Sequence, residues 1–475
     1  MRADVMESVE KYVDEVWEDV VSDIASLVAY PSVADTSEAE PGAPFGRSVR
    51  DALDCALSIA GRLGYQVSDD AGYVGMADIP GEREEHIATI AHVDVVPAGP
   101  GWCTDPFSME RREGWLLGRG VIDDKGPAVL SLYAGAFFLR EGITPRYTFR
   151  ALLGCDEEVG MTDVKHYLAG HEQPLFLFTP DAEFPVCNAE KGCFGGTFKS
   201  AKIENGVIRS WSGAEATNAI PSQSECIVAV PLSELPAPQA NADRITLEDA
   251  GEGCTRIFAQ GIGGHASLPE GTINAIALVA GYLHEVMDAQ PDLFDPAERS
   301  YLDLLSVVHD GTAGEGLGIA AESDAFGALT CNAGTIEVAD GHILQTIDVR
   351  YPDSTTSDEM TMICGAHASR FGAEFIAGRA KEPFSVSADS PAVRALLNTY
   401  REVTGKPAEP FSMGGGTYAR NFKSAVSFGP EDNDLELPAW AGSMHGPNEA
   451  ANEQLLRDAL KMYIIALVRL NELEF

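Results

Sequence analysis

Apolar side chains recur every three or four residues at the start of the chain. Between Val5 and Val28 they fall on one helical face, at Val9, Val13, Val16, Val20, Ile24 and Leu27. This spacing predicts an amphipathic helix that ends before Pro31. A second helix is expected from Ser48 to about Leu63, where the same period continues.

Three short apolar runs then end in polar clusters: HIATIAH (86–92), FRALLGC (149–155) and PLFLFTP (174–180). Runs of β-branched and large apolar residues bounded by turn formers are typical of buried strands. A helix is expected between the first two, from about Pro127 to Arg140. Strands that alternate with helices predict a mainly parallel sheet with helices on both faces. Such sheets bind ligands beyond the carboxyl ends of their strands.

The pattern changes between residues 195 and 379. Apolar and polar residues alternate in ECIVAVP and HILQTIDVRYP, as in antiparallel strands with one solvent-exposed face. Helices are expected over 273–287 and 357–372. After Glu382 the α/β pattern returns with PAVRALLNTYREVTG, the strand-like SAVSFGP and a helix from Glu453 to Leu470. We therefore predict an α/β domain formed by residues 1–194 and 380–475, with an α+β domain of residues 195–379 inserted into it.

The composition restricts which classes of partner the chain could bind. The chain of 475 residues has 33 Lys and Arg against 73 Asp and Glu, a formal net charge of −40. Phosphate groups and anionic lipids would repel it, so we expect no nucleic-acid or membrane partner. The nine cysteines form no C-x-x-C pair, and the N-terminus lacks the apolar core of a secretory signal. No apolar run reaches the length of a membrane span. These features favour a cytoplasmic protein.

Histidine and acidic residues follow the predicted strands. His92 and Asp94 lie two residues apart at a strand end, so both side chains leave the same face. His92 could hold a metal ion while Asp94 orients its ring, although a histidine in the core wall has the same pattern. Asp123 and Asp124 precede a helix, where they are either capping residues or the source of a carboxylate that bridges two metal ions.

Further acidic residues and a second histidine add to these candidate metal ligands. Asp156, Glu157 and Glu158 stand in a row after a strand, and such a cluster is costly unless a cation or a proton offsets it. In a metal-dependent hydrolase, one carboxylate binds a metal ion and a second carboxylate in the same pocket accepts a proton. The alternative interpretation of these three acids is a solvated acidic loop. Asp181 follows the third strand, and His445 precedes the last helix. Such mixed N and O donors suit Zn²⁺, Mn²⁺ or Co²⁺.

Five segments, in this order, resemble the motifs of the M20 family of metallopeptidases: HVDVVPAGPGW, GRGVIDDKGP, GCDEEVG, TPDAEFP and SMHGPNEA. DDKGP and PDAEFP resemble in particular the PepV-like aminoacyl dipeptidase branch, and LVAYPSV fits the family's opening helix and turn. The resemblance covers nearly the whole chain.

The resemblance implies a centre of two divalent metal ions, most simply zinc, with manganese or cobalt as alternatives. His92 and Asp181 would hold one ion, Glu158 and His445 the other, and Asp123 would bridge them. The peptide bond between Asp123 and Asp124 is expected to be cis.

The resemblance also implies residues that act on the substrate. Glu157 would be the general base and Asp94 would orient a metal ligand. The inserted domain would be a lid, in which His265 stabilises the oxyanion. Asn218 and Arg350 of the lid would also hold the substrate's terminal carboxylate, and the loop of Gly414, Gly415 and Gly416, outside the lid, could present backbone N–H groups to it.

We therefore expect hydrolysis of dipeptides or very short peptides that carry a free C-terminal carboxylate, with Glu157 acting on a water between the metal ions. The size of the insertion favours a monomer. Three alternatives stay open: an N-acyl amino-acid deacylase or desuccinylase, a carboxypeptidase for longer peptides, and a non-catalytic metal- or peptide-binding protein. Glu157 argues against the last, because a pure binder needs no unliganded acid beside its metal ions.

Overall fold

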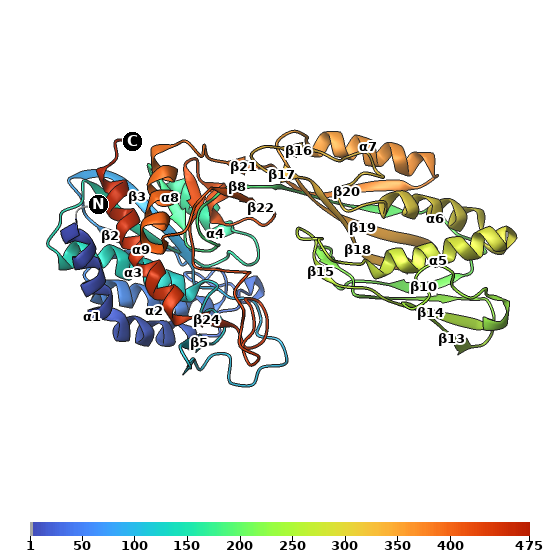
Figure 1. Ribbon diagram of the computed structural model, residues 1–475, viewed down its shortest axis with the longest axis horizontal. Coiled ribbons are helices and arrows are strands. Elements are labelled where there is room, and N and C mark those ends of the chain that lie inside the picture. Colours follow the sequence, from blue (N-terminus) through green and yellow to red (C-terminus); the bar gives the residue numbers. More distant parts are fainter. Residues whose placement is uncertain (1–2) are drawn as a thin grey trace. The chain divides into compact units, whose positions relative to one another are not determined.

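The structure is a computed structural model that describes residues 3–475, with side chains from Met6 onward. It contains two compact units (Figure 1). Unit 1 holds the chain up to Asn188 together with Ser385–Phe411 and Gly416–Phe475, and unit 2 holds Ala189–Phe384 and Ser412–Gly415. The catalytic role of residues 1–194 and 380–475 and the lid role of residues 195–379 stay predictions. No helix within residues 3–475 has both the length and the apolar character needed to cross a lipid bilayer.

Unit 1 contains the helices predicted near both ends of the chain and the helix predicted between the first two strands. Its α-helices are α1 (Ala3–Val28), α2 (Arg47–Arg62), α3 (Lys125–Arg140), α4 (Thr162–Gly170), α8 (Pro391–Thr404) and α9 (Glu453–Glu472). Short 3-10 helices cover Thr36–Glu38 and Tyr418–Asn421. The four helices expected in this part of the sequence are confirmed within a few residues, α8 lies in the segment PAVRALLNTYREVTG, and α4 was not predicted. Helices α1, α3 and α9 pack against one another (Figure 1).

The main sheet of unit 1 is parallel at its centre. Seven of its nine strands run in the order β1-β2-β6-β3-β7-β23-β8, and β21 and β22 both pair with β8. They are β1 (Gln66–Asp70), β2 (Val74–Ile79), β6 (Tyr147–Gly154), β3 (Arg83–His92), β7 (Leu177–Thr179), β23 (Ala425–Ser427) and β8 (Cys187–Glu190). Strands β6, β3, β7 and β23 are parallel, whereas β1, β2 and β8 are antiparallel to their neighbours. The sheet also contains β21 (Phe384–Ser385) and β22 (Phe411–Met413). A separate three-stranded sheet has the order β24 (Ala450–Asn452), β5 (Trp115–Leu117) and β4 (Glu110–Arg112).

Helices cover both faces of this sheet, as predicted. Phe149 of β6 packs against Gly135 of α3 on one face. On the other face, Arg150 donates a hydrogen bond to Tyr167 of α4, and Gly154 lies against the ring of Tyr418. The alternation of side chains along a strand therefore separates the two helix layers. His92 is opposite Gly154 in the register of β3 and β6, so its side chain lies on the α4 and Tyr418 face.

Unit 2 has the predicted α+β composition. Two four-stranded antiparallel sheets have the orders β10-β12-β14-β13 and β18-β19-β9-β20. Their strands are β10 (Ile208–Ser212), β12 (Gln223–Val228), β14 (Cys254–Gln260), β13 (Ile245–Gly251), β18 (Thr330–Ala339), β19 (His342–Tyr351), β9 (Gly192–Lys199) and β20 (Glu374–Lys381). The short strands are β11 (Ala219–Ile220), β15 (Gly264–His265), β16 (Glu322–Ser323) and β17 (Gly327–Ala328).

Three helices cover the sheets of unit 2: α5 (Ala275–Ala289), α6 (Pro296–Val308) and α7 (Ser357–Arg370). Short 3-10 helices cover Leu232–Glu234 and Pro291–Leu293. Helix α5 packs on β12 and β14, and α7 packs on β9 and β20 (Figure 1). Helices α5 and α7 confirm the predictions for 273–287 and 357–372, whereas α6 was missed. The apolar side chains of these elements form a core of their own.

Replacement of Gly154 with alanine is expected to destabilise unit 1. The added Cβ would overlap the hydroxyl and ring of Tyr418, which is fully buried. Overpacking of this kind costs about 1–3 kcal/mol, so thermal unfolding should shift to lower temperature. Gly170→Ala is the matched control, because a Cβ there meets no atom within 4 Å. Equal melting temperatures for the two variants would contradict the proposed packing of Tyr418.

Candidate metal centre

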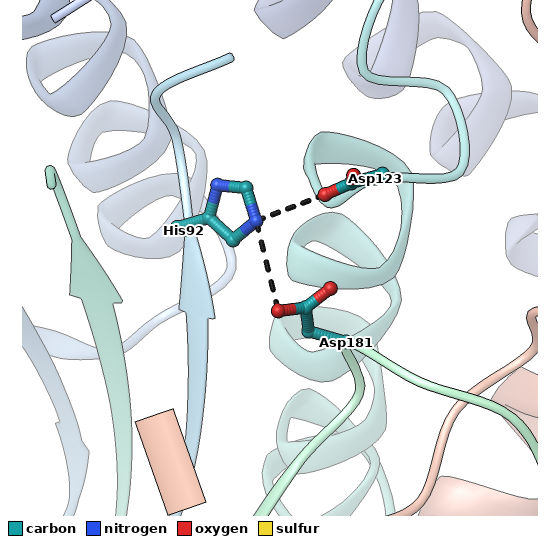
Figure 2. Close-up of side chains that lie close together, drawn as sticks. All are labelled: His92, Asp123 and Asp181. Carbon is teal, nitrogen blue, oxygen red and sulfur yellow. Dashed lines mark hydrogen bonds and ion pairs between the residues drawn. The ribbon is translucent and has the colours of Figure 1, made fainter. Parts of the chain in front are cut away.

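The carboxyl ends of two strands and the turn before a helix bring His92, Asp123 and Asp181 together in unit 1 (Figure 2). His92 is the last residue of β3, Asp123 precedes α3, and Asp181 follows β7. The His92 Nε2 lies 3.0 Å from Asp123 Oδ1 and 3.9 Å from Asp181 Oδ2. Figure 2 shows the two carboxylates pointing toward the imidazole. The first metal-ligand triad therefore lies where α/β sheets bind ligands.

A second triad shares Asp123 with the first. The His445 Nε2 lies 2.8 Å from Asp123 Oδ2 and 3.3 Å from Glu158 Oε2. Within each triad one ligand atom per residue lies within 4.8 Å of the others. Asp123 turns one oxygen toward His92 and the other toward His445. The structure thus brings all five predicted metal ligands together, and the peptide bond between Asp123 and Asp124 is cis.

The residues of both triads fit divalent cations. Among the residues described, Glu158 Oε1 is buried and has no hydrogen-bond partner. A buried carboxylate oxygen without a partner is costly, and a cation would remove that cost. The donors are imidazole nitrogens and carboxylate oxygens, a set that suits Zn²⁺, Mn²⁺ or Co²⁺. Two ions, one in each triad, are therefore compatible with the donors present.

Asp94 holds the loop that carries Glu157 and Glu158. Its carboxylate accepts hydrogen bonds from the N–H groups of Glu157 at 3.3 Å and Glu158 at 3.2 Å. The His92 Nδ1 lies 3.0 Å from the main-chain carbonyl of Asp94 and 3.5 Å from its carboxylate. Asp94 therefore contacts His92 through its backbone more closely than through the side chain that the sequence singled out.

A second carboxylate, Asp163, supports the same loop from α4. It accepts hydrogen bonds from the N–H groups of Cys155 at 2.7 Å and Asp156 at 3.1 Å, and from the hydroxyl of Tyr418. Burial raises the pKa of Asp163 to about 7. Asp163 and Tyr418 could not be identified as part of the site from the sequence, because neither belongs to a segment that contributes a ligand.

Burial and neighbouring charges shift the ionisation of the centre. Burial raises the pKa of Glu157 well above its ordinary value, and the Asp181 carboxylate adds to the rise. Burial and the Asp123 carboxylate raise the pKa of Asp181 to about 7. Hydrogen bonds to Asp123 and Glu158 raise the pKa of His445 to about 11. Glu157 belongs to neither triad, and burial among these carboxylates raises its pKa.

The predicted lid residues gather within unit 2. The Asn218 Nδ2 lies 3.5 Å from the His265 Nε2, because β11 pairs with β15. The His265 Nδ1 lies 2.7 Å from Ser267 Oγ, and a side chain at Gly414 would overlap Ser267. Arg350 donates to the Gly414 carbonyl at 2.9 Å.

The surroundings of Arg350 include two groups that the sequence did not identify. Its Nε donates to Asp348 at 2.7 Å, and its Nη1 lies 2.9 Å from Cys193 Sγ. Gly415 also belongs to unit 2, whereas Gly416 opens the last segment of unit 1. Arg350 is thus fixed by an acid on its own strand, and its guanidinium in turn anchors the glycine loop.

Known proteins resemble this chain over almost its whole length. Residues 88–469 match peptidase family M20/M25/M40. YtjP of Bacillus subtilis (strain 168), provisionally named a dipeptidase, is 33% identical over 466 residues, which are 95% of this chain and 97% of the relative. The Beta-Ala-Xaa dipeptidase of Lactobacillus delbrueckii subsp. lactis is 32% identical over 462 residues, or 94% and 93% of the two chains.

A solved structure shows the same fold. The dipeptidase Dug1p from Saccharomyces cerevisiae aligns over 99% of both chains with a TM-score of 0.60 at 14% identity. The resemblance read from the motifs is therefore confirmed by the family match, by full-length relatives and by the fold. This chain belongs to peptidase family M20/M25/M40.

Proposed function

We propose that this protein, a peptide-bond hydrolase by family, cleaves dipeptides and very short peptides that carry a free C-terminal carboxylate, with two divalent metal ions. The observation that carries the proposal is the pair of triads that share Asp123, with Glu157 beside them and in neither. Zinc fits the donors, with manganese or cobalt as alternatives. We expect a cytoplasmic monomer.

Glu157 acts as the general base. When bound, the metal ions lower the pKa of water and polarise the scissile carbonyl. Glu157 takes the proton of the attacking water and later passes it to the leaving amine. Its raised pKa supports this role, because burial makes the carboxylate a stronger proton acceptor. The hydrogen bond from its N–H to Asp94 fixes the backbone from which it acts.

Unit 2 supplies most of the groups that recognise the substrate, and Gly416 of unit 1 completes the glycine loop. His265 donates a hydrogen bond to the oxyanion that develops on the carbonyl. The contact of its Nδ1 with Ser267 supports this role, because it orients the ring. Arg350 and Asn218, with the Gly414, Gly415 and Gly416 loop, hold the terminal carboxylate. The hydrogen bond from Arg350 to the Gly414 carbonyl supports their action as one group.

A substrate panel tests the proposal. The chelator-treated protein is loaded with zinc, manganese or cobalt and offered dipeptides, longer peptides, and N-acetyl and N-succinyl amino acids. We expect turnover of dipeptides, little turnover of longer peptides or acylated amino acids, and none without metal. Turnover of only the acylated compounds would establish a deacylase instead. Activity that is unchanged after complete metal removal would contradict the two-metal proposal.

A further inference from the structure

An ion pair with no role in the proposed chemistry lies beside the metal centre in unit 1. The Arg119 Nη1 donates to Glu449 Oε2 at 2.5 Å, and the two side chains are 1% and 0% exposed. Burial of two charges is expensive, so such a pair is by itself weak evidence of stabilisation. Its other contacts indicate what the pair does.

Glu449 organises the turn that ends at Asp123. Its Oε1 accepts hydrogen bonds from the N–H groups of Gly120 at 3.0 Å, Ile122 at 3.2 Å and Asp123 at 3.4 Å. Its main-chain carbonyl accepts another from Gly118 at 3.0 Å. A single buried residue therefore fixes the backbone from which the shared metal ligand projects.

Arg119 organises the loop that carries His445. Its Nη2 donates to the carbonyls of His445 at 3.2 Å and Gly446 at 3.3 Å. This loop needs support, because the His445 side chain is 54% exposed and its backbone has a φ of +60°, a left-handed conformation that is uncommon outside glycine. Burial and backbone preference alone therefore do not hold this ligand in place.

We propose that Arg119 and Glu449 are a positioning pair that sets the separation of Asp123 and His445, and thereby the affinity of the Asp123–Glu158–His445 triad for its metal ion. This inference rests on the proposed function for the presence of that ion. The other triad depends less on the pair. His92 is fully buried at the end of a strand, and its ring is held by the Asp94 carbonyl.

The variants are Arg119→Lys and Glu449→Gln. Lysine keeps the charge but cannot reach both carbonyls and Glu449 at once. Glutamine keeps an oxygen for the N–H groups but turns an amide toward Arg119. The matched control is Arg150→Lys, which weakens the partly buried pair of Arg150 and Asp78 elsewhere in unit 1. Each chelator-treated protein is titrated with zinc against a chromophoric chelator, and the melting temperature of the metal-free form is recorded.

We expect both variants to lose about 10–100-fold in affinity for one of two zinc ions, the usual effect of removing a group that orients a metal ligand. The other ion should lose less affinity, because Asp123 is the one described member of its triad that the pair contacts, and the control should keep the affinities of the wild type. Three outcomes would overturn this inference and leave the two-metal proposal standing. They are unchanged zinc affinities, an equal loss of affinity in the control, and a lower melting temperature without a change in affinity. Binding of fewer than two zinc ions by the wild type would overturn the two-metal proposal and this inference with it.

Discussion

Glu157→Gln is expected to lower dipeptide turnover by about 10²–10⁴-fold, the range that one acid–base group contributes, while both metal ions stay bound. Glutamine keeps the size of the side chain but cannot take up the proton of the attacking water. The ligand triads do not include Glu157, so their donors are unchanged. Steady-state kinetics with saturating zinc and metal analysis of the same sample measure the two effects together.

The control for this variant is Glu172→Gln, the same chemical change at an exposed position after α4. It should keep full turnover and two metal ions. If Glu157→Gln loses a metal ion together with its activity, Glu157 is a ligand and not the base. If the variant stays active with both ions bound, the base is another group.

Most of the fold could be predicted wherever a face of an element is buried. Helices α1 and α2 each show the helical period, and the buried residues of β3 and β6 are near-continuous apolar runs. Strands β1 and β20 were missed because most of their side chains are exposed, so no alternation marks them. Helix α6 was missed although it begins with a signal in the sequence: Asp295 and Glu298 form a capping box around Pro296.

The ligands of the candidate centre could be predicted because chemistry restricts them to His, Asp and Glu in recognisable segments. The residues that hold these ligands could not. Arg119 and Glu449 lie within quoted motifs, but their contact joins positions 330 residues apart, and no spacing reveals it. Asp163 supports the Glu157 loop from a helix that the sequence did not predict. Positioning groups act through backbone N–H and carbonyl groups, which every residue has, so they leave no pattern of residue types.

Asp123→Ala is expected to remove both metal ions and all measurable turnover. One oxygen of this carboxylate faces His92 and the other faces His445, so its loss takes a donor from each triad. Asp181→Ala, which removes a donor from one triad only, should still retain the ion of the other. Asp123→Asn is the graded case, because the amide keeps one oxygen and should hold a single ion. Metal analysis after gel filtration counts the ions in each variant.

Asp123→Ala should also lower the stability of the metal-free protein. His92 is fully buried, and its Nε2 would lose the Asp123 oxygen that lies 3.0 Å away. A buried polar group left without a partner costs about 1–3 kcal/mol, so the variant should unfold at a lower temperature even in the presence of chelator. Asp123→Asn should lose less, because its oxygen can still face the imidazole. Two ions bound to Asp123→Ala would show that the triads do not share this carboxylate, since none of the other described side chains contributes to both.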